Sequence, residues 1–198
     1  MEVPGEEGAM AMIETDGCRD KARKIRFLGM NVNGVLTNGQ IFHLGGLRQP
    51  AIAFDSHDGA GIGLAQKAGI VVAFMTGYPD LKAILPRAKK LGVGEAFVYR
   101  GDDDKRTVLK RWLNALRFSP EQAAFIGDDL GDAVLFEKVG MCIAVASARP
   151  EIRLISDLVT EAKGGEGAVR EAIEYILKAQ GEWNKLLLAT SPLFKYVI

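Results

Sequence analysis

Short apolar runs alternate with longer amphipathic stretches along most of the chain, and this alternation constrains the fold more than any other feature. The pattern is typical of strand-helix-strand units arranged around a parallel sheet. The clearest apolar runs are residues 25–30, 70–75, 96–99, 123–126, 141–145 and 158–160. The sequence therefore predicts an α/β fold with a doubly wound parallel sheet.

The stretches between these runs have the apolar spacing of amphipathic helices. We expect helices over residues 58–67, 80–91, 104–116, 130–138, 150–155 and 167–180. Pro86 should kink the second of these helices, because proline lacks the backbone N–H that a helix interior requires. Residues 40–43 and 51–54 break the rhythm, since they flank Leu44-Gly45-Gly46 as two strands flank a turn. We expect a small β-hairpin flap over about residues 39–56, and no large cap domain.

A chain of 198 residues favours one globular unit, which we place at residues 24–185. We expect residues 1–23 to form a disordered leader, because their single apolar patch is too short for a signal peptide or a spanning helix. Residues 186–198 form an apolar C-terminal tail. The tail could pack on its own core or on a neighbouring subunit, and the sequence does not decide between them.

Charge and cysteine content narrow the class of partner. The chain has 25 basic and 25 acidic residues, so its balance does not favour nucleic acid or a polybasic membrane contact. A small molecule or another protein is the expected partner. Cys18 and Cys142 do not form a disulfide framework or a metal-binding pattern, which is typical of a cytoplasmic protein.

Polar residues follow several of the predicted strands. In a parallel sheet, ligands collect where the strand-to-helix loops converge, at the carboxyl ends of the strands. The segments found there are residues 31–34, 76–78, 101–105 and 127–132. Each segment alone is ordinary turn or helix-cap chemistry, but four in this order indicate one polar site.

Together these segments resemble the motifs of the haloacid-dehalogenase superfamily, and most closely the 3-deoxy-D-manno-octulosonate 8-phosphate phosphatase family. The matching segments are NVNGVLTNG at 31–39, TGY at 76–78, DK at 104–105, GDDLGD at 127–132 and GGEGAVRE at 164–171. The resemblance extends from about residue 24 to 185. It implies a Rossmann-like fold and a small phosphorylated or anionic ligand, and it also implies a homotetramer in which flap and tail reach a neighbour.

The resemblance also implies a set of site residues. In the family one aspartate is the nucleophile and a second is the general acid and base, and these positions are Asn31 and Asn33 here. Mg²⁺ would be held by Asp128, by the side chain of Asn31 and by the backbone carbonyl of Asn33, with Asp129 behind them. The phosphate-binding positions are Thr76, Gly77 and Lys105.

The first motif departs from the family where the chemistry is most demanding. A carboxamide is a very poor nucleophile, and it has no proton to exchange near neutral pH. A unit charge about 4 Å from its partner is worth roughly 4 kcal/mol at an effective dielectric near 20, so metal affinity should fall by several powers of ten. Loss of general acid catalysis removes roughly another hundred- to ten-thousand-fold in rate. We therefore predict a family member that is catalytically impaired or inactive and binds Mg²⁺ weakly.

Other departures from the family motifs also weaken the expected phosphate site. Tyr78, Glu166 and His57 stand where the family has arginine, and Asn38 alters the end of the first motif. Two alternatives stay open. One is an active phosphomonoesterase in which Asp128, Asp129, Asp132 and residues 102–104 take rearranged roles, and the other is a structural role within an oligomer.

Overall fold

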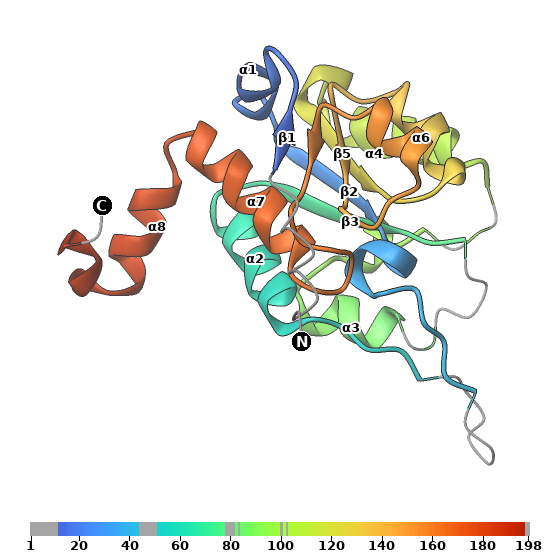
Figure 1. Ribbon diagram of the computed structural model, residues 1–198, viewed down its shortest axis with the longest axis horizontal. Helices are drawn as coiled ribbons and strands as arrows, with labels where there is room; N and C mark the ends of the chain where they lie inside the picture. The colour runs from blue at the N-terminus through green and yellow to red at the C-terminus, as the bar shows by residue number, and fades with distance from the viewer. Residues whose placement is uncertain are drawn as a thin grey trace, which may run out of the picture.

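The computed structural model describes residues 12–43, 51–77, 82, 84–99, 101 and 103–196, and they form an α/β fold around one sheet (Figure 1). The strands are β1 (Ile13–Glu14), β2 (Phe27–Asn31), β3 (Val71–Met75), β4 (Ala123–Gly127), β5 (Met141–Ala144) and β6 (Leu158–Val159). Their order is β1-β6-β5-β4-β2-β3. Every neighbouring pair is parallel except β1 with β6. The predicted α/β fold is confirmed.

Helices cover both faces of the sheet. They are α1 (Cys18–Ala22), α2 (Ser56–Lys67), α3 (Ile84–Lys90), α4 (Lys105–Leu116), α5 (Ala133–Phe136), α6 (Pro150–Leu154), α7 (Ala168–Ala179) and α8 (Trp183–Thr190). Helices α2 and α7 pack against each other in front of the sheet, and α4 lies behind it (Figure 1). On the α4 side, Trp112 contacts Phe27 of β2, and Phe136 of α5 contacts Phe125 of β4.

The two central strands are buried along almost their whole length. Phe27, Leu28, Met30, Phe125 and Ile126 are all fully buried. Strands covered on both faces have no polar side, which explains why their sequences are continuous apolar runs rather than alternating ones. Because the strands themselves are buried, a ligand can be reached only by the polar residues that follow each strand.

The register of the sheet brings those residues to one edge. Asn31, the last residue of β2, pairs with Met75 of β3. Met30 pairs with Ile126 of β4, so β2 and β4 also end side by side. The loops that follow β2, β3 and β4 therefore converge, as the sequence predicts.

The predicted disordered leader is wrong for residues 12–23, while residues 1–11 lie outside the described part. Ile13 and Glu14 add the antiparallel strand β1 to the edge of β6. Cys18 and Ala22 of α1 are fully buried, and the α1 backbone is tied to α7 because Gln180 Nε2 donates to the carbonyl of Ala22 at 3.1 Å. Two small apolar residues on one short helix face give a weak sequence signal, and only their burial under distant elements orders this segment.

The structure differs from three local predictions as well. Residues 95–97 form a 3₁₀ turn, so the strand expected at 96–99 is reduced to one bridge between Val98 and Phe74. The flap appears as one antiparallel bridge between Phe42 and Ala51, and the residues of its turn, 44–50, lie outside the described part. Pro86 lies in the first turn of α3, where its missing N–H costs nothing.

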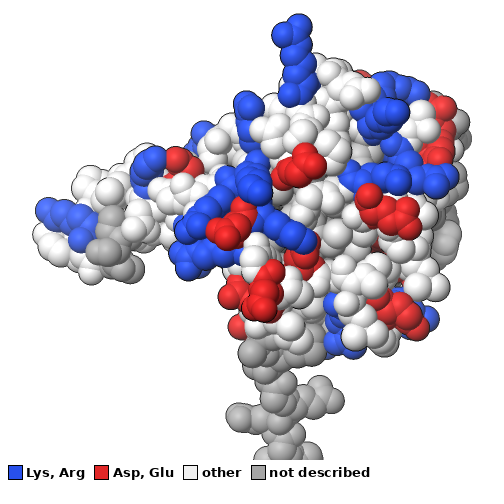
Figure 2. Space-filling model, turned by 90° about the horizontal axis from the view of Figure 1, so that it is seen from above, with Lys and Arg blue, Asp and Glu red and all other residues white. Residues whose placement is uncertain are grey.

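The C-terminal tail projects from the body in both views (Figures 1 and 2). Leu186 is partly buried against the core, but Leu188, Leu193 and Tyr196 are 42%, 73% and 77% exposed. The alternative in which the tail packs on its own core thus holds only for its beginning. Within the described part of the chain, no helix is long and apolar enough to cross a membrane.

Candidate active site

The loop after β2 forms the floor of the site. Asn31 ends the strand, and a tight turn over Val32–Leu36 follows, closed by the N–H of Thr37 donating to the carbonyl of Val32 at 3.1 Å. Gly34 has a φ of +88°, which non-glycine residues rarely adopt. A Cβ on Gly34 would lie 2.0 Å from Oδ2 of Asp128. The loop therefore needs glycine both for its turn and for its close approach to Asp128.

The side chain of Asn31 bridges the site. Its Oδ1 accepts a hydrogen bond from the backbone N–H of Val32 at 2.9 Å. Its Nδ2 donates to the backbone carbonyl of Asn33 at 3.0 Å and to Oδ1 of Asp128 at 2.8 Å. Both hydrogens of the amide and its oxygen are thus satisfied, and the partners fix which atom is nitrogen.

A second loop, between β4 and α5, presents Asp128. The buried carboxylate of Asp132 holds this loop, because its Oδ2 accepts from the N–H of Asp128 at 3.0 Å. Its Oδ1 lies 3.4 Å from Nζ of Lys105, which comes from the N-terminus of α4. Asp132 therefore connects the predicted metal position with the predicted phosphate position.

The structure brings Thr76 to the same place. Oγ1 of Thr76 lies 3.5 Å from Oδ1 of Asn33, a long contact at the limit of a hydrogen bond. Thr76 is buried at the end of β3, whereas Gly77 beside it is exposed. Asn31, Asn33, Thr76, Lys105 and Asp128 are thus gathered as the sequence predicts.

Asp128 is the most perturbed acid in the cluster. The pKa of Asp128 is raised to about 6: burial is the largest cause, the hydrogen bond from the Asn31 amide lowers it, and the carboxylates of Asp132 and Asp129 raise it. Desolvation disfavours the charged form, while a donated hydrogen bond favours it. The amide of Asn31 is therefore the group that stabilises this carboxylate most directly.

The residues present do not fit the magnesium site that the family implies. Such a site needs oxygen lone pairs from the first-motif side chain, the Asn33 carbonyl and Asp128. Here an N–H donor of Asn31 points at both of the other two oxygens. Turning the amide over would offer its oxygen to a cation but would set Nδ2 against the N–H of Val32, donor against donor.

The remaining predicted site residues and the other departures from the family motifs differ from this cluster in their exposure. The Asp129 carboxylate is exposed and caps its own turn, accepting from the N–H of Leu130 at 2.8 Å. His57, Glu166 and Asn38 are exposed, and Tyr78 lies outside the described residues. Asp129, His57, Glu166 and Asn38 are thus exposed, unlike the buried Thr76 and Asp132.

Sequence reasoning missed residues that hold the loops together. A Cβ on Gly164 would lie 1.7 Å from the carbonyl oxygen of Gly34, so two loops touch through their backbones. The N–H of Gly164 donates to Oγ of Ser147 at 3.1 Å, and the N–H of Arg149 donates to the carbonyl of Asp128 at 2.8 Å. The glycine pair that opens GGEGAVRE was the available signal, because a glycine pair marks a possible close approach.

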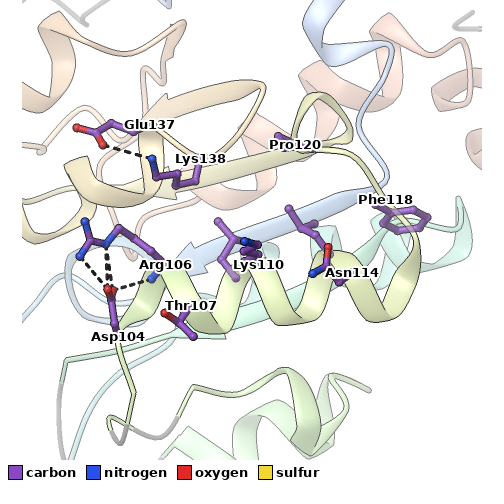
Figure 3. Close-up of a pocket in the computed structure, with 11 residues that line it drawn as sticks. Asp104, Arg106, Thr107, Lys110, Asn114, Phe118, Pro120, Glu137 and Lys138 are labelled. Carbon is purple, nitrogen blue, oxygen red and sulfur yellow. Dashed lines mark hydrogen bonds and ion pairs between the residues drawn. The ribbon is translucent and has the colours of Figure 1, made fainter.

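A separate groove of about 500 Å³ lies along α4 (Figure 3). Two ion pairs line it, Arg106 with Asp104 at 2.8 Å and Lys138 with Glu137 at 3.8 Å. Its floor includes Leu109 and Leu113, which belong to the core. The groove thus runs along α4, and its lining residues include none of Asn31, Asn33, Thr76, Lys105 and Asp128.

Comparison with known proteins finds relatives of one kind, phosphatases of the haloacid dehalogenase-like type. The model of the haloacid dehalogenase-like hydrolase family matches residues 80–173. The 3-deoxy-D-manno-octulosonate 8-phosphate phosphatase KdsC of Escherichia coli K12 is 40% identical over 165 residues, which are 83% of this chain and 86% of that protein. KdsC of Salmonella typhi is also 40% identical over 165 residues, which are 83% of this chain and 86% of that protein.

Solved structures agree with these sequence matches. The phosphatase of the same name from Moraxella catarrhalis, in complex with a magnesium ion, a phosphate ion and a KDO molecule, has a TM-score of 0.83 and 33% identity. That match covers 90% of this chain and all of the other. The phosphatase from Yersinia pestis has a TM-score of 0.80 and 37% identity, over 87% of this chain and 95% of the other.

Proposed function

The chain belongs to the 3-deoxy-D-manno-octulosonate 8-phosphate phosphatase family of haloacid dehalogenase-like hydrolases, and from that premise we propose a member that does not turn over phosphate esters. In this proposal the protein keeps the phosphatase fold and a pocket for a small phosphorylated or anionic ligand. It acts by binding and assembly rather than by hydrolysis.

One observation carries the proposal: the first-motif side chain at the end of β2 is a carboxamide whose nitrogen is hydrogen-bonded to Asp128. Covalent phosphoryl transfer needs a carboxylate oxygen with a free lone pair at that position. The amide nitrogen of Asn31 has no such lone pair, and its oxygen faces the N–H of Val32. Asn33, two residues on, offers no proton for a leaving group.

The anion-binding part of the site is better preserved. Lys105 retains 20% exposure of its side chain and stands at the N-terminus of α4, where the helix dipole favours negative charge. Thr76 is held beside Asn33. A phosphate or carboxylate group is therefore the ligand chemistry that these groups would recognise.

The alternative of rearranged catalysis has less support. It needs carboxylates among Asp128, Asp129, Asp132 and residues 102–104 to take the roles of the missing ones. Asp132 already accepts from the Asp128 backbone and pairs with Lys105, and Asp129 caps its own turn. Their engagement favours a structural role for both side chains.

Assembly is the second part of the proposal. We propose a homo-oligomer, with a tetramer as the family expectation, because the exposed apolar residues of the tail beyond Leu186 would be covered by a neighbouring copy. The two cysteines are free thiols, in keeping with a reducing cytoplasm. Light scattering tests the assembly, and a monomeric mass would contradict it.

The central test is an assay of the purified wild-type protein with Mg²⁺ against a generic phosphate ester and 3-deoxy-D-manno-octulosonate 8-phosphate. We expect no turnover above the blank. Turnover at ordinary enzymatic rates, about 1 s⁻¹ or more, would contradict the proposal. Intact-mass analysis must accompany the assay, because deamidation of Asn33, which precedes Gly34, would restore an acid.

Two variants give the assay a matched comparison. Asn31→Asp with Asn33→Asp restores both carboxylates and should raise the rate by several powers of ten. Asn38→Asp adds one such negative charge at an exposed position on the same loop and should leave the rate at the blank. A rise in both would indicate a contaminating phosphatase.

A further inference from the structure

The nitrogen of Asn31 lies between the two oxygens that the family's metal site would use, the Asn33 carbonyl and Asp128 Oδ1. We propose that this amide takes the place of the divalent cation, so that the site is assembled without any metal. The inference deepens the proposed function and rests on it, because it describes the same site in a protein that does not hydrolyse its ligand.

Hydrogen-bond geometry supports the replacement. The two donor distances from Nδ2, 3.0 Å to Asn33 and 2.8 Å to Asp128, are normal for N–H···O bonds. The Asn31 oxygen is occupied by Val32 N–H at 2.9 Å. One planar group thus joins the first-motif loop to the loop of Asp128, as a bridging cation otherwise would.

The charge count points the same way. Asparagine stands at positions 31 and 33 where the family has aspartate, so two negative charges are lost. A divalent cation carries two positive charges, so losing the cation as well leaves the net charge of the site unchanged. Lys105 lies 3.4 Å from Asp132, so these two charges pair, while the Asp128 carboxylate accepts a hydrogen bond from the neutral Asn31 amide. The amide therefore satisfies the Asp128 oxygen as a hydrogen-bond donor, although it does not neutralise the charge of that carboxylate.

A cation entering this position would break contacts that the protein already has. It would have to expel an amide from both oxygens, and it would gain only one carboxylate among its ligands. Within the described ranges, no three or more His, Cys, Asp or Glu side chains are grouped so as to hold a metal ion. The Asn33 carbonyl and the Asp128 carboxylate therefore already have a hydrogen-bond donor, the Asn31 amide.

Metal titration of three proteins tests this inference without measuring activity. Wild type, Asn31→Asp and the control Asn38→Asp are titrated with Mg²⁺ by calorimetry, and their melting temperatures are compared with Mg²⁺ and with EDTA. We expect no saturable heat and no shift for wild type and Asn38→Asp. Asn31→Asp should melt lower in EDTA, because it places a second carboxylate against Asp128, and should bind Mg²⁺ about a hundredfold or more tightly than wild type.

A second measurement does not depend on Asn31→Asp, in case that variant fails to fold. The electron paramagnetic resonance signal of free Mn²⁺ should stay undiminished when the protein is added. Stoichiometric Mn²⁺ or Mg²⁺ binding that Asp128→Asn abolishes overturns the inference. Metal binding without turnover would sink this inference and leave the proposed function standing, whereas turnover without metal binding would do the reverse.

Discussion

Two aspartates of this protein, the buried Asp58 and the partly buried Asp128, have similar pKa values and differ in their hydrogen-bond partners. Asp58 of α2 and Asp128 of the site loop both have a pKa raised to about 6, in each case chiefly by burial. Asp128 accepts from the side chain of Asn31 at 2.8 Å. Asp58 accepts from the backbone N–H of Arg170, in the first turn of α7, at 2.9 Å.

The difference separates a structural acid from a functional one. A backbone donor at a helix N-terminus is present whatever side chain occupies its position, so Asp58 caps α7 from a neighbouring helix. The donor to Asp128 is a side chain, and a single substitution replaces it. A perturbed pKa alone therefore does not identify the active site here, while the type of partner does.

The largest effect should come from Gly164→Ala in the site region. The new Cβ would lie 1.7 Å from the backbone oxygen of Gly34, so the two loops must separate. We expect a loss of at least about 4 kcal/mol of unfolding free energy, or no folded protein. Urea denaturation measures the loss, with Gly131→Ala as the control because nothing lies within 4 Å of its Cβ position. A loss near zero for Gly164→Ala would mean that the loops are not in contact.

Asp58→Ala should have the next largest effect. It removes the acceptor of the Arg170 N–H at a fully buried position and leaves a small cavity. We expect a loss of about 2–3 kcal/mol by urea denaturation. Asp55→Ala is the matched comparison, since Asp55 is half-buried and caps its own helix at His57 N, and it should lose only about 1 kcal/mol. Equal losses would remove the special role of Asp58.

Asp58 should also make stability depend on pH. Its pKa is raised from 3.8 to about 6, so between these values the folded protein holds a proton that the unfolded chain has released. Stability therefore increases as pH falls through this window, by at most ~3 kcal/mol. The charge of Asp55, the N-cap of α2, also raises the pKa of Asp58, and the hydrogen bond from the backbone N–H of Arg170 lowers it.

Asp58→Asn isolates this contribution. The difference in unfolding free energy between wild type and Asp58→Asn should shift in favour of wild type as the pH is lowered from 7 to 4. Asp128 is present in both proteins, so its own titration cancels in the difference. A difference that stays flat across the window would show that Asp58 is ionised throughout.

The central strands and the long helices could be predicted because their signals are local. The runs at 25–30, 70–75 and 123–126 became β2, β3 and β4 within two residues at each end, and residues 167–180 became α7. The placement of Asn31, Thr76 and Asp128 at one edge followed from the rule that parallel strands share an edge for their carboxyl ends.

What escaped prediction depends on contacts between distant parts of the chain. The Asn31–Asp128 bond joins residues 97 apart in sequence, and the Asp58–Arg170 bond joins residues 112 apart. Residues 12–23 gain their order from β6 and α7 in the same way. Composition and periodicity carry no information about such pairs, so the sequence could name Asn31 and Asp128 without showing that one hydrogen-bonds to the other.

The smallest effect concerns the glycines of α2, the helix that carries Asp58. A Cβ on Gly61 would lie 3.1 Å from the backbone Cα of Arg170, whereas a Cβ on Gly63 would meet nothing within 4 Å. Glycine inside a helix is less stable than alanine by roughly 0.5–1 kcal/mol, mainly because the unfolded chain loses more freedom. Gly63→Ala should therefore stabilise the protein by about that amount. Gly61→Ala should destabilise it, because the contact that holds α7 against α2 must open. Urea denaturation of the two variants decides the point, since equal stabilisation by both would mean that α2 and α7 are packed less closely than the Asp58 cap requires.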